Sequence, residues 1–298
     1  VELVIVVTPN KADYFSEYIP DHLTRNKETT NYDYFSKKLQ EAHFNVLDAN
    51  AWFKAIKTES EYPLMTRTGI HWSIYGSTFF ADSLVSYIEQ TLGREMVHFV
   101  VDSIEYPCTP RDTDKDLEDL ANIFSRDGSS IYAYPYSYVH EENDDGFKPD
   151  MVVIGDSFFW NFYQGYFTIC FDEIHFWYYF HSIFPPLPQK IATTDEIDIV
   201  QQTLNKDVLL LVTSTDNLKD FGFGFIEYMH EYLQMDSLQK YNHLIPRYVK
   251  SINNDPELME SARTKAAERN ISIDSMIYLD ACWLAGKHLE EIGDAVEN

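Results

Sequence analysis

The sequence predicts an α/β fold with a doubly wound parallel sheet. Three apolar runs, at residues 1–7, 151–154 and 207–213, are typical of strands that other elements cover on both faces. Between them lie segments with helical periodicity; in residues 31–43, apolar side chains recur three and four positions apart. This alternation of strand and helix patterns is the rhythm of a doubly wound sheet.

The elements that we expect follow one another along the chain without internal repeats or low-complexity tracts. We expect strands at residues 1–8, 45–48, 97–101, 131–139, 151–154 and 207–213, with the tyrosine-rich 131–139 strand, which contains Pro135, at a sheet edge. We expect helices at residues 31–43, 50–57, 74–91, 158–165, 194–204, 222–233, 241–252, 256–268 and 275–290. Residues 1–235 are therefore predicted to form an α/β domain, and residues 236–298 a helical C-terminal extension.

Composition and charge narrow the classes of function. The chain has 298 residues, 45% of them hydrophobic, and a formal net charge of −25. So acidic a protein is a poor ligand for nucleic acid or for an anionic membrane, and the spread of its charges favours an ordinary acidic surface. No apolar run reaches the ~20 residues of a membrane-spanning helix. Because the chain starts inside an apparent core strand, we expect that a signal or anchor segment precedes it.

Two acidic or histidine-containing segments raise the question of a metal site. Residues 107–127 hold many carboxylates, but they lack the glycine and final glutamate of an EF-hand, so a solvated helix start is favoured. Asp172, His175 and His181 cannot share one face of either a helix or a strand. We therefore expect no metal. The aromatic side chains of residues 170–181 fit either a sugar-stacking surface or core packing, and residues 141–145 are read as an acidic loop.

The segment Gly155-Asp156-Ser157 directly follows the apolar run 151–154. Gly155 permits a sharp bend at the end of a strand, which places Ser157 where open α/β sheets bind ligands. Backbone N–H groups at such a turn can hold an oxyanion. Ser157 is therefore a candidate nucleophile.

A serine nucleophile needs a neighbouring base, and His71 is the best-placed candidate. His71 and Trp72 lie in a loop just before the helix expected at 74–91. A lone histidine more commonly satisfies local backbone groups, but the serine makes the catalytic reading the stronger one here. Asn10 and Lys11 leave the first strand at the same edge of the sheet, where they either reach the site or cap the loop.

Three segments carry a resemblance to a known family. They are residues 6–20, with Pro9-Asn10-Lys11 followed by Tyr and Glu-Tyr-Ile-Pro; residues 67–76, with Arg-Thr-Gly-Ile-His-Trp; and residues 155–158, with Gly-Asp-Ser-Phe. In these segments, and in having the histidine before the serine, the chain resembles the alginate O-acetyltransferase-like branch of the SGNH-hydrolase superfamily. This branch occurs with bacterial exopolysaccharide acetylation systems. The resemblance covers about residues 1–235.

The resemblance implies a three-layer SGNH-type sandwich with a parallel central sheet. It also implies a serine acetyl-enzyme mechanism in which an acetyl group passes through Ser157 to a sugar hydroxyl or to water, with His71 as general base. The side chains expected near the substrate or oxyanion are Arg67, Asn10, Lys11, Trp72 and Asp156. The expected partners are a polysaccharide acceptor and a membrane-bound O-acyltransferase, at a periplasmic or cell-envelope location, without a cofactor.

One position departs from the family pattern. The family places an Asp two residues before the histidine, and this chain has Gly69 there. Loss of such an orienting carboxylate costs a serine protease on the order of 10⁴ in rate. Another carboxylate could replace it, and we expect Asp48 at the end of the second strand; alternatively a Ser–His dyad suffices, or the protein is a degenerate member that binds polysaccharide. A carbohydrate acetylesterase is the alternative with the same chemistry.

Overall fold

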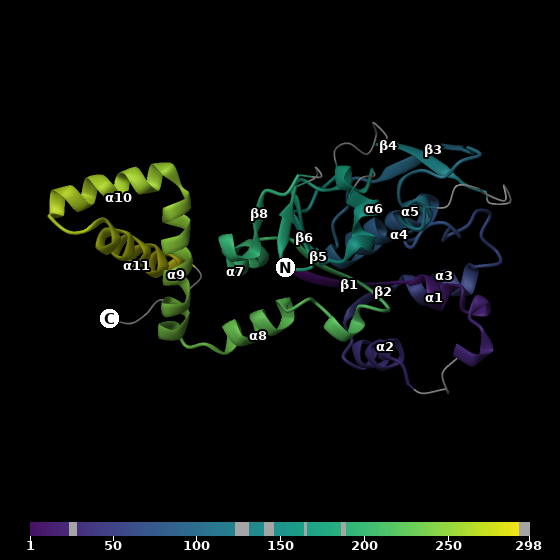
Figure 1. Cartoon of the computed structure of the whole chain (residues 1–298), viewed down its shortest axis with the longest axis horizontal. Coiled ribbons are helices and arrows are strands. Elements are labelled where there is room, and N and C mark those ends of the chain that lie inside the picture. The colour runs from purple at the N-terminus through teal and green to yellow at the C-terminus, as the bar shows by residue number, and fades with distance from the viewer. Residues whose placement is uncertain (24–28, 123–130, 140–145, 164–165, 186–188, 292–298) are drawn as a thin grey trace. The chain divides into compact units, whose positions relative to one another are not determined.

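The structure is a computed structural model that describes residues 1–23, 29–122, 131–139, 146–163, 166–185 and 189–291 (Figure 1). The chain divides into two compact units. The larger unit contains residues 1–191 and 203–223, and the smaller one residues 192–202 and 224–298. The sequence-predicted boundary after residue 235 thus lies within the smaller unit.

A mainly parallel sheet forms the centre of the larger unit, as the sequence predicts. Its strands follow the order β2 (Asn45–Asp48), β1 (Glu2–Thr8), β9 (Val208–Ser214), β5 (Met151–Gly155), β6 (Ile174–Tyr178) and β7 (Ser182–Phe184). All of the neighbouring pairs are parallel except β6 with β7. Strands β5 and β9 are buried along their whole length, which explains their uniformly apolar sequences. Their carboxyl ends lie side by side, with Gly155 in register with Val212.

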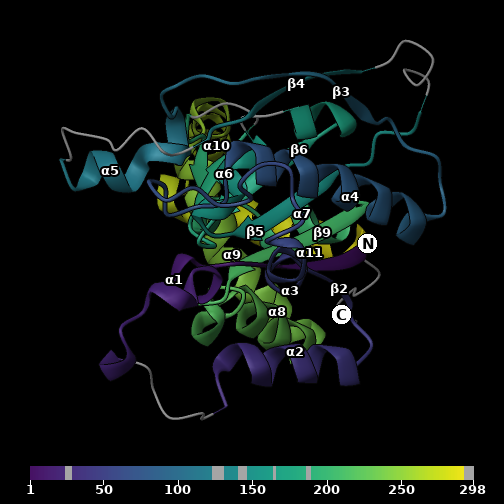
Figure 2. The ribbon, with the colours of Figure 1, turned by 90° about the vertical axis from the view of Figure 1, so that its right-hand side faces the viewer.

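Helices cover the sheet on both faces. These helices are α1 (Lys11–Tyr14), α2 (Asn31–Glu41), α3 (Ala49–Ile56), α4 (Ile74–Leu92) and α6 (Trp160–Tyr163). Helices α4 and α6 lie on one side and α2 on the other (Figures 1 and 2). Side chains of α3, α4 and α6 pack in one cluster with Val4, Val153 and Leu210 of the sheet. The predicted three-layer α/β architecture is confirmed.

Strands β3 (Phe99–Glu105) and β4 (Tyr134–Val139) form a separate antiparallel sheet of two strands. The sequence correctly predicts β4 as a strand that tolerates a proline. It starts β3 two residues early and ends it four residues early. Strands β3 and β4 pair with each other, so neither of them extends the central sheet.

The charge-rich segment is a short 3₁₀ helix, Asp112–Lys115, followed by α5 (Asp116–Leu120). The expectation of a solvated helix is wrong for two of its acids, because Asp114 is 1% and Glu118 4% exposed. Residues 123–127 of this segment and the acidic loop at 141–145 lie outside the described residues. The segment packs on the loop before α4, which determines the geometry of the site below.

The smaller unit is mainly helical. It contains β8 (Ala192–Thr193), most of α7 (Ile199–Leu204), α8 (Phe225–Gln234), α9 (Ser237–Asn254), α10 (Pro256–Arg269) and α11 (Ile273–Glu291). Its core includes Leu244, Ile252, Ala266, Ile277 and Leu289. The three last helices are those that the sequence predicts, although α9 starts four residues earlier.

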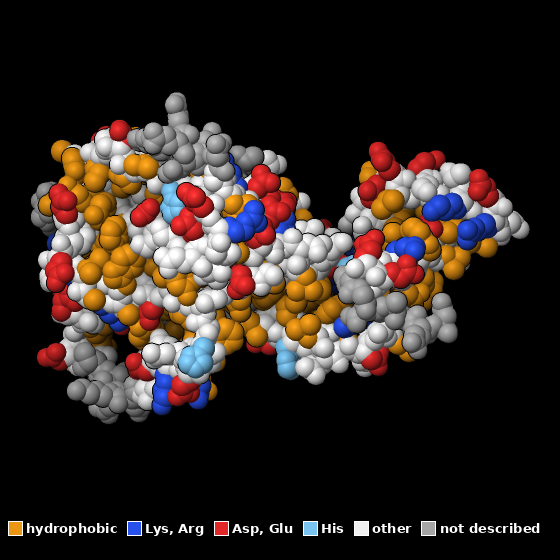
Figure 3. Space-filling view, turned by 180° about the vertical axis from the view of Figure 1, so that it is seen from behind, with side chains coloured by type: hydrophobic (Ala, Val, Ile, Leu, Met, Phe, Trp, Pro, Cys, Tyr) orange, Lys and Arg blue, Asp and Glu red, His pale blue; other side chains and the backbone are white. Residues whose placement is uncertain are grey.

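Two further expectations concern the spread of acidic side chains over the surface and the absence of a membrane-spanning helix. Acidic side chains are scattered among the other residues on the face shown in Figure 3, rather than gathered into one field. Within the described part of the chain, every helix is too short or too polar to cross a membrane.

Candidate active site

Three side chains from separate parts of the larger unit form a hydrogen-bonded row. Ser157 Oγ lies 2.8 Å from His71 Nε2, and His71 Nδ1 lies 2.5 Å from Asp116 Oδ2. The His71 side chain is 13% and that of Asp116 28% exposed, so the row is shielded but reachable. The network assigns the tautomer: Nδ1–H donates to the carboxylate, which leaves Nε2 to accept from the serine hydroxyl.

Ser157 occupies the first turn after β5, and a buried carboxylate fixes that turn. Asp156 is fully buried, and its Oδ2 accepts from the backbone N–H and hydroxyl of Ser214 at 2.7 Å each and from Asn217 Nδ2 at 3.0 Å. Its Oδ1 accepts from Phe158 N at 3.1 Å. Burial raises the pKa of Asp156, while these donors act to lower it. Asp156 therefore ties the serine turn to the end of β9.

The sharp turn also depends on the glycine at the end of β5. A Cβ atom on Gly155 would lie 3.0 Å from the Val212 Cβ atom and 3.1 Å from the Val212 oxygen. Such contacts are tighter than side chains normally tolerate, so the close approach of β5 and β9 favours glycine at this position.

The loop that carries His71 is held by several short bonds. The Thr66 hydroxyl accepts from Gly69 N at 2.9 Å. Lys11 Nζ donates to the backbone carbonyl oxygens of Thr66 and Gly69 at 2.7 and 2.5 Å. Asp116 Oδ1 accepts from Ile70 N at 2.7 Å. Asp116 thus holds both the imidazole and the backbone next to it, which limits the orientations open to His71.

Asp48 is not the partner of His71, contrary to the sequence-based expectation. Its Oδ2 accepts from the Tyr32 hydroxyl at 2.7 Å, and its Oδ1 accepts from Ala51 N at 2.8 Å and caps α3. An N-cap aspartate commonly makes such a bond, and its two oxygens are occupied. The carboxylate bonded to His71 is that of Asp116.

Gly69 explains why an aspartate could not serve at the family position. A Cβ atom on Gly69 would collide with the carbonyl oxygen of Thr113 and lie 2.8 Å from Thr66 Oγ1. The 3₁₀ segment Asp112–Lys115 occupies the space that a side chain would need. The same segment leads directly into Asp116, so the backbone that excludes one carboxylate supplies another.

Two of the five residues expected near the substrate support the site from within the core. Trp72 is fully buried, and its indole N–H donates to the Phe158 oxygen at 3.1 Å. Its ring contacts that of Phe158. Trp72 and Asp156 therefore cannot stack on or bind a substrate from their buried positions, and the expectation that they touch it is corrected.

Asn10 lies at the same sheet edge but has its own partners. Its amide nitrogen donates to Thr215 Oγ1 at 2.7 Å, and its oxygen accepts from Asp13 N at 2.7 Å as the cap of α1. The capping alternative considered for Asn10 therefore matches its contacts.

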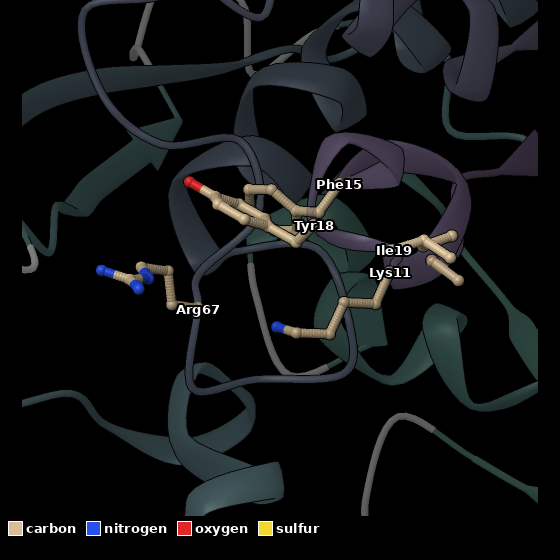
Figure 4. A pocket seen from close by; sticks show the side chains of 6 residues that line it. Lys11, Phe15, Tyr18, Ile19 and Arg67 are labelled. Atoms are coloured by element: carbon tan, nitrogen blue, oxygen red, sulfur yellow. The ribbon is translucent and has the colours of Figure 1, made fainter. Parts of the chain in front are cut away.

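Lys11 and Arg67 line a hollow of about 370 Å³ together with Ala12, Phe15, Tyr18 and Ile19. In Figure 4 the rings of Phe15 and Tyr18 lie across the hollow from the Arg67 guanidinium. Burial lowers the pKa of Lys11 to about 8, against the smaller raising effect of Asp116. A second hollow of about 240 Å³ shares Phe15 and Arg67 with the first. Both hollows are lined by Arg67, which lies four positions before His71 in the same loop.

The residues considered for a metal have other neighbours. His175 Nε2 lies 3.3 Å from Glu173 Oε1, and His181 Nδ1 lies 3.0 Å from the Ser182 hydroxyl. In the part of the chain that the structure describes, no group of three or more His, Cys, Asp or Glu side chains is arranged to hold a metal ion. The aromatic side chains in and just after β6 divide between core and surface: Phe176 and Trp177 are buried, and Tyr179, which follows the strand, is 40% exposed.

Sequence reasoning missed Asp116 as a member of the site. The segment holds five acids within eight positions, and nothing in their spacing distinguishes the one that faces His71 from the other four. Only the fold of the 3₁₀ segment against the loop selects it. The glycine two positions before the histidine was the usable signal, because it showed that the carboxylate had to come from elsewhere.

Comparison with known proteins identifies the family. The sequence-family model described as SGNH hydrolase-like domain, acetyltransferase AlgX, matches residues 1–163. Among solved structures, the O-acetyltransferase domain of Pseudomonas putida AlgJ is 17% identical, with a TM-score of 0.38 over 79% of this chain and 69% of that one. Bacillus cereus PatB1 with a sulfonyl adduct is 13% identical, with a TM-score of 0.49 over 76% of this chain and 86% of that one.

Pseudomonas aeruginosa AlgX is 12% identical, with a TM-score of 0.44 over 76% of this chain and 57% of that one. No match was found among curated protein sequences. The family match spans more than half of the chain and includes both Ser157 and His71. The chain belongs to the family of SGNH hydrolase-like domains typified by the acetyltransferase AlgX.

Proposed function

We propose that the protein is a carbohydrate O-acetyltransferase that acts through an acetyl-serine at Ser157. The observation that carries this proposal is the continuous row Ser157–His71–Asp116, with Oγ to Nε2 at 2.8 Å and Nδ1 to Oδ2 at 2.5 Å. A hydroxyl is a poor nucleophile until a neighbouring base takes its proton, and this geometry supplies the base and the group that orients it. Family membership supports acetyl transfer as the reaction.

In the first half-reaction, His71 Nε2 takes the proton of Ser157 Oγ as Oγ attacks the carbonyl carbon of the acetyl donor. The new Oγ–C bond gives a tetrahedral oxyanion, and the bond from carbon to the donor's oxygen then breaks. The imidazolium returns its proton to that leaving oxygen. Asp116 stabilises the imidazolium while it exists and need not accept the proton itself.

In the second half-reaction, a sugar hydroxyl gives its proton to His71 Nε2 and attacks the acetyl carbon. The Oγ–C bond breaks, and the imidazolium restores the Ser157 hydroxyl. If water takes the place of the sugar, the same steps describe an acetylesterase. The choice between these outcomes depends on how well the site holds an acceptor and excludes water.

The serine turn offers a donor for the oxyanion. The backbone N–H groups of Asp156, Phe158 and Phe159 donate to Val212 O, Asp156 Oδ1 and Asp156 O. Among the described residues, none of these turn bonds occupies the N–H of Ser157. A free N–H on the nucleophile itself is the usual position of one oxyanion donor, so we assign it that role.

The hollow beside the His71 loop is the proposed place of the acceptor. The rings of Phe15 and Tyr18 offer faces for the C–H surface of a sugar, and Arg67 offers donors for its oxygens. Lys11 contributes mainly by holding the loop. A polysaccharide acceptor, a membrane-bound O-acyltransferase that supplies acetyl groups, and an extracytoplasmic location complete the proposal.

The test is acetylation of the protein by p-nitrophenyl acetate, followed by intact mass, with Ser157→Ala and the matched control Ser103→Ala. Ser103 is an exposed serine of β3, so its replacement changes hydroxyl count without touching the row. We expect a gain of one acetyl group in the wild type and in Ser103→Ala, and none in Ser157→Ala. No acetylation of the wild type, or equal acetylation of Ser157→Ala, would contradict the proposed nucleophile.

Adding sugar acceptors to the acetylated protein distinguishes acetyl transfer from hydrolysis. Neutral, amino and uronic acid oligosaccharides serve as acceptors, and mass spectrometry detects acetyl esters on them. A sugar ester formed faster than acetate is released supports the transferase. Acetate release that no acceptor changes would favour the acetylesterase.

A further inference from the structure

We propose that Asp114 is a positioning residue for this reaction, because it holds the segment that carries Asp116 against the loop that carries His71. This inference rests on the proposed function for its kinetic test, but its geometric content can be tested separately. Asp114 is not in the row itself. Its side chain and its backbone nevertheless bond to both ends of the loop in which His71 lies.

The side chain connects two elements that share no sequence proximity. Asp114 is 1% exposed, and its Oδ1 accepts from Ile74 N at 3.1 Å. Ile74 is the first residue of α4 and lies three positions after His71, whereas Asp114 lies two positions before Asp116. This hydrogen bond therefore joins the start of α4, just after His71, to the segment that carries Asp116.

The backbone of Asp114 makes a second connection to the same loop. Its carbonyl oxygen accepts from the hydroxyls of Thr66 and Thr68 at 2.9 and 2.6 Å. The Thr68 oxygen in turn accepts from Glu118 N at 3.0 Å. The two segments are thus joined on both sides of the bond between His71 and Asp116, and a change in one bond alone leaves the others to partly compensate.

Capping of α4 alone does not account for the buried carboxylate, although Asp114 does satisfy one N–H group at the start of this helix. Ser73 already caps this helix, because its hydroxyl accepts from Gly76 N at 2.8 Å. Burying a carboxylate is costly unless its bonds compensate, and an apolar side chain would fill the space without that cost. The position of the carboxylate between the two segments gives it a use that neither capping nor packing requires.

The charged and titratable groups around Asp114 come from its own segment and from β4. Asp112 and Asp116 act on it from the same segment, and the Tyr134 hydroxyl acts from β4. Burial is the main cause that raises the pKa of Asp114 to about 7, and the nearby acids add to it. Because Asp114 can be neutral without losing Oδ1 as an acceptor, the link to Ile74 N survives protonation.

The kinetic test compares Asp114→Ala with Asp114→Asn in acylation by p-nitrophenyl acetate. Asparagine retains an oxygen that can accept from Ile74 N, and alanine does not. We expect Asp114→Ala to lower the acylation rate by about tenfold or more with little change in KM, and Asp114→Asn to recover most of that loss. Rates are divided by the fraction of active sites measured from the acetyl burst.

A role limited to folding would not change the pH profile of the correctly folded fraction. Misalignment of Asp116 weakens its stabilisation of the imidazolium, so in Asp114→Ala we expect the acidic limb of the acylation profile to move to lower pH. Equal profiles and equal rates per active site in Asp114→Ala and the wild type would overturn the proposal.

A second pair of variants applies if Asp114→Ala does not fold. Thr68→Val removes one hydroxyl that donates to the Asp114 oxygen and preserves side-chain volume. Thr78→Val is the matched control, because Thr78 donates in the same way to the Ile74 oxygen within α4. We expect Thr68→Val to lower the acylation rate per active site by about two- to fivefold and Thr78→Val to leave it unchanged. Equal rates in the two variants would contradict the proposal.

A measurement without turnover separates this proposal from the proposed function. The proton on His71 Nδ1 gives a low-field NMR signal when it is held by a carboxylate, and His71→Gln identifies that signal by its loss. We expect the signal to move upfield in Asp114→Ala and to remain near its wild-type position in Asp114→Asn. If the wild type is not acetylated but the signal behaves in this way, the proposed function fails and the positioning role stands. A signal that is unchanged in Asp114→Ala would refute the positioning role whatever the activity.

Discussion

The Asp116 carboxylate lies 2.5 Å from the Nδ1 atom of His71, although 45 positions separate the two residues in the chain. The family pattern places this carboxylate two residues before the histidine, on the same loop. Here it comes from a separate segment that packs on that loop. The contact between imidazole and carboxylate is present here, but the carboxylate comes from another place in the sequence.

Replacement of Asp116 by Asn is expected to lower the acylation rate by about 10²–10⁴-fold, because the imidazole loses the partner that selects its tautomer and stabilises its charge. Pre-steady-state acylation by p-nitrophenyl acetate measures this loss. Asp119→Asn serves as the control, since Asp119 pairs with Lys115 on the exposed side of α5. An Asp116→Asn protein that is folded and as fast as the control would show that the Ser157–His71 pair suffices.

An aspartate restored at the family position is not expected to rescue this loss. In the double variant Gly69→Asp with Asp116→Asn, the new side chain would collide with the Thr113 oxygen, so the loop must shift. We expect a lower melting temperature than in Asp116→Asn alone and no recovery of acylation. Recovery to near wild-type rates would mean that the 112–115 segment can move aside for the new side chain, although it is hydrogen-bonded to the loop that carries His71.

Replacement of Trp72 by Phe tests whether this side chain supports the site or binds substrate. Phenylalanine fills most of the space but cannot donate to the Phe158 oxygen, so the turn after Ser157 loses one bond. We expect a free energy of unfolding lower by about 1–3 kcal/mol and a lower acylation rate with unchanged KM for an oligosaccharide acceptor. A selective rise in the acceptor KM would instead indicate direct contact with the sugar.

The buried Asp114 predicts a dependence of stability on pH. Its pKa is raised from 3.8 to about 7 in the folded protein, so between about pH 4 and pH 7 the folded state holds a proton that the unfolded state has released. Asp114 therefore lowers the free energy of unfolding as pH rises through this window, by at most about 4 kcal/mol. Urea unfolding of wild type and Asp114→Asn across the window measures this contribution.

The stability of Asp114→Asn relative to the wild type should increase with pH up to about 7 and then remain constant. The variant itself is the control for all other titrating groups, because it shares them with the wild type. Parallel stability curves for the two proteins would contradict a raised pKa at this position.

Much of the fold follows from local patterns. The buried runs of β1, β5 and β9 and the periodicity of α2 and α4 identify these elements, because a strand covered on both faces and a helix with one buried face leave distinct records in sequence. The serine after β5 and the histidine before α4 were also recognisable. The serine segment follows the end of a strand and the histidine segment precedes the start of a helix, and local residues determine both boundaries.

The partner of His71 was not recognisable in the same way. Asp48 and Asp116 are both acids near the start of a helix, and both make ordinary hydrogen bonds there. What distinguishes them is which surface each helix start faces after the chain has folded. Trp72 and Asp156 were misjudged for the same reason, because burial depends on the whole packing and not on the neighbouring sequence.

The sequence by itself determined the α/β class, the central strands β1, β5 and β9, the candidate nucleophile and base, and the absence of an aspartate at position 69, since these depend on residue type and local spacing; strands β6 and β7 were not predicted. Tertiary structure decided that Asp116 replaces that aspartate, that Lys11 and Asp114 hold the loop, and that Trp72 lies in the core. The physical reason is that a hydrogen bond between distant segments is specified by backbone packing. Many carboxylates have the chemistry to make this bond, and among the described residues it is Asp116 whose carboxylate lies 2.5 Å from the imidazole.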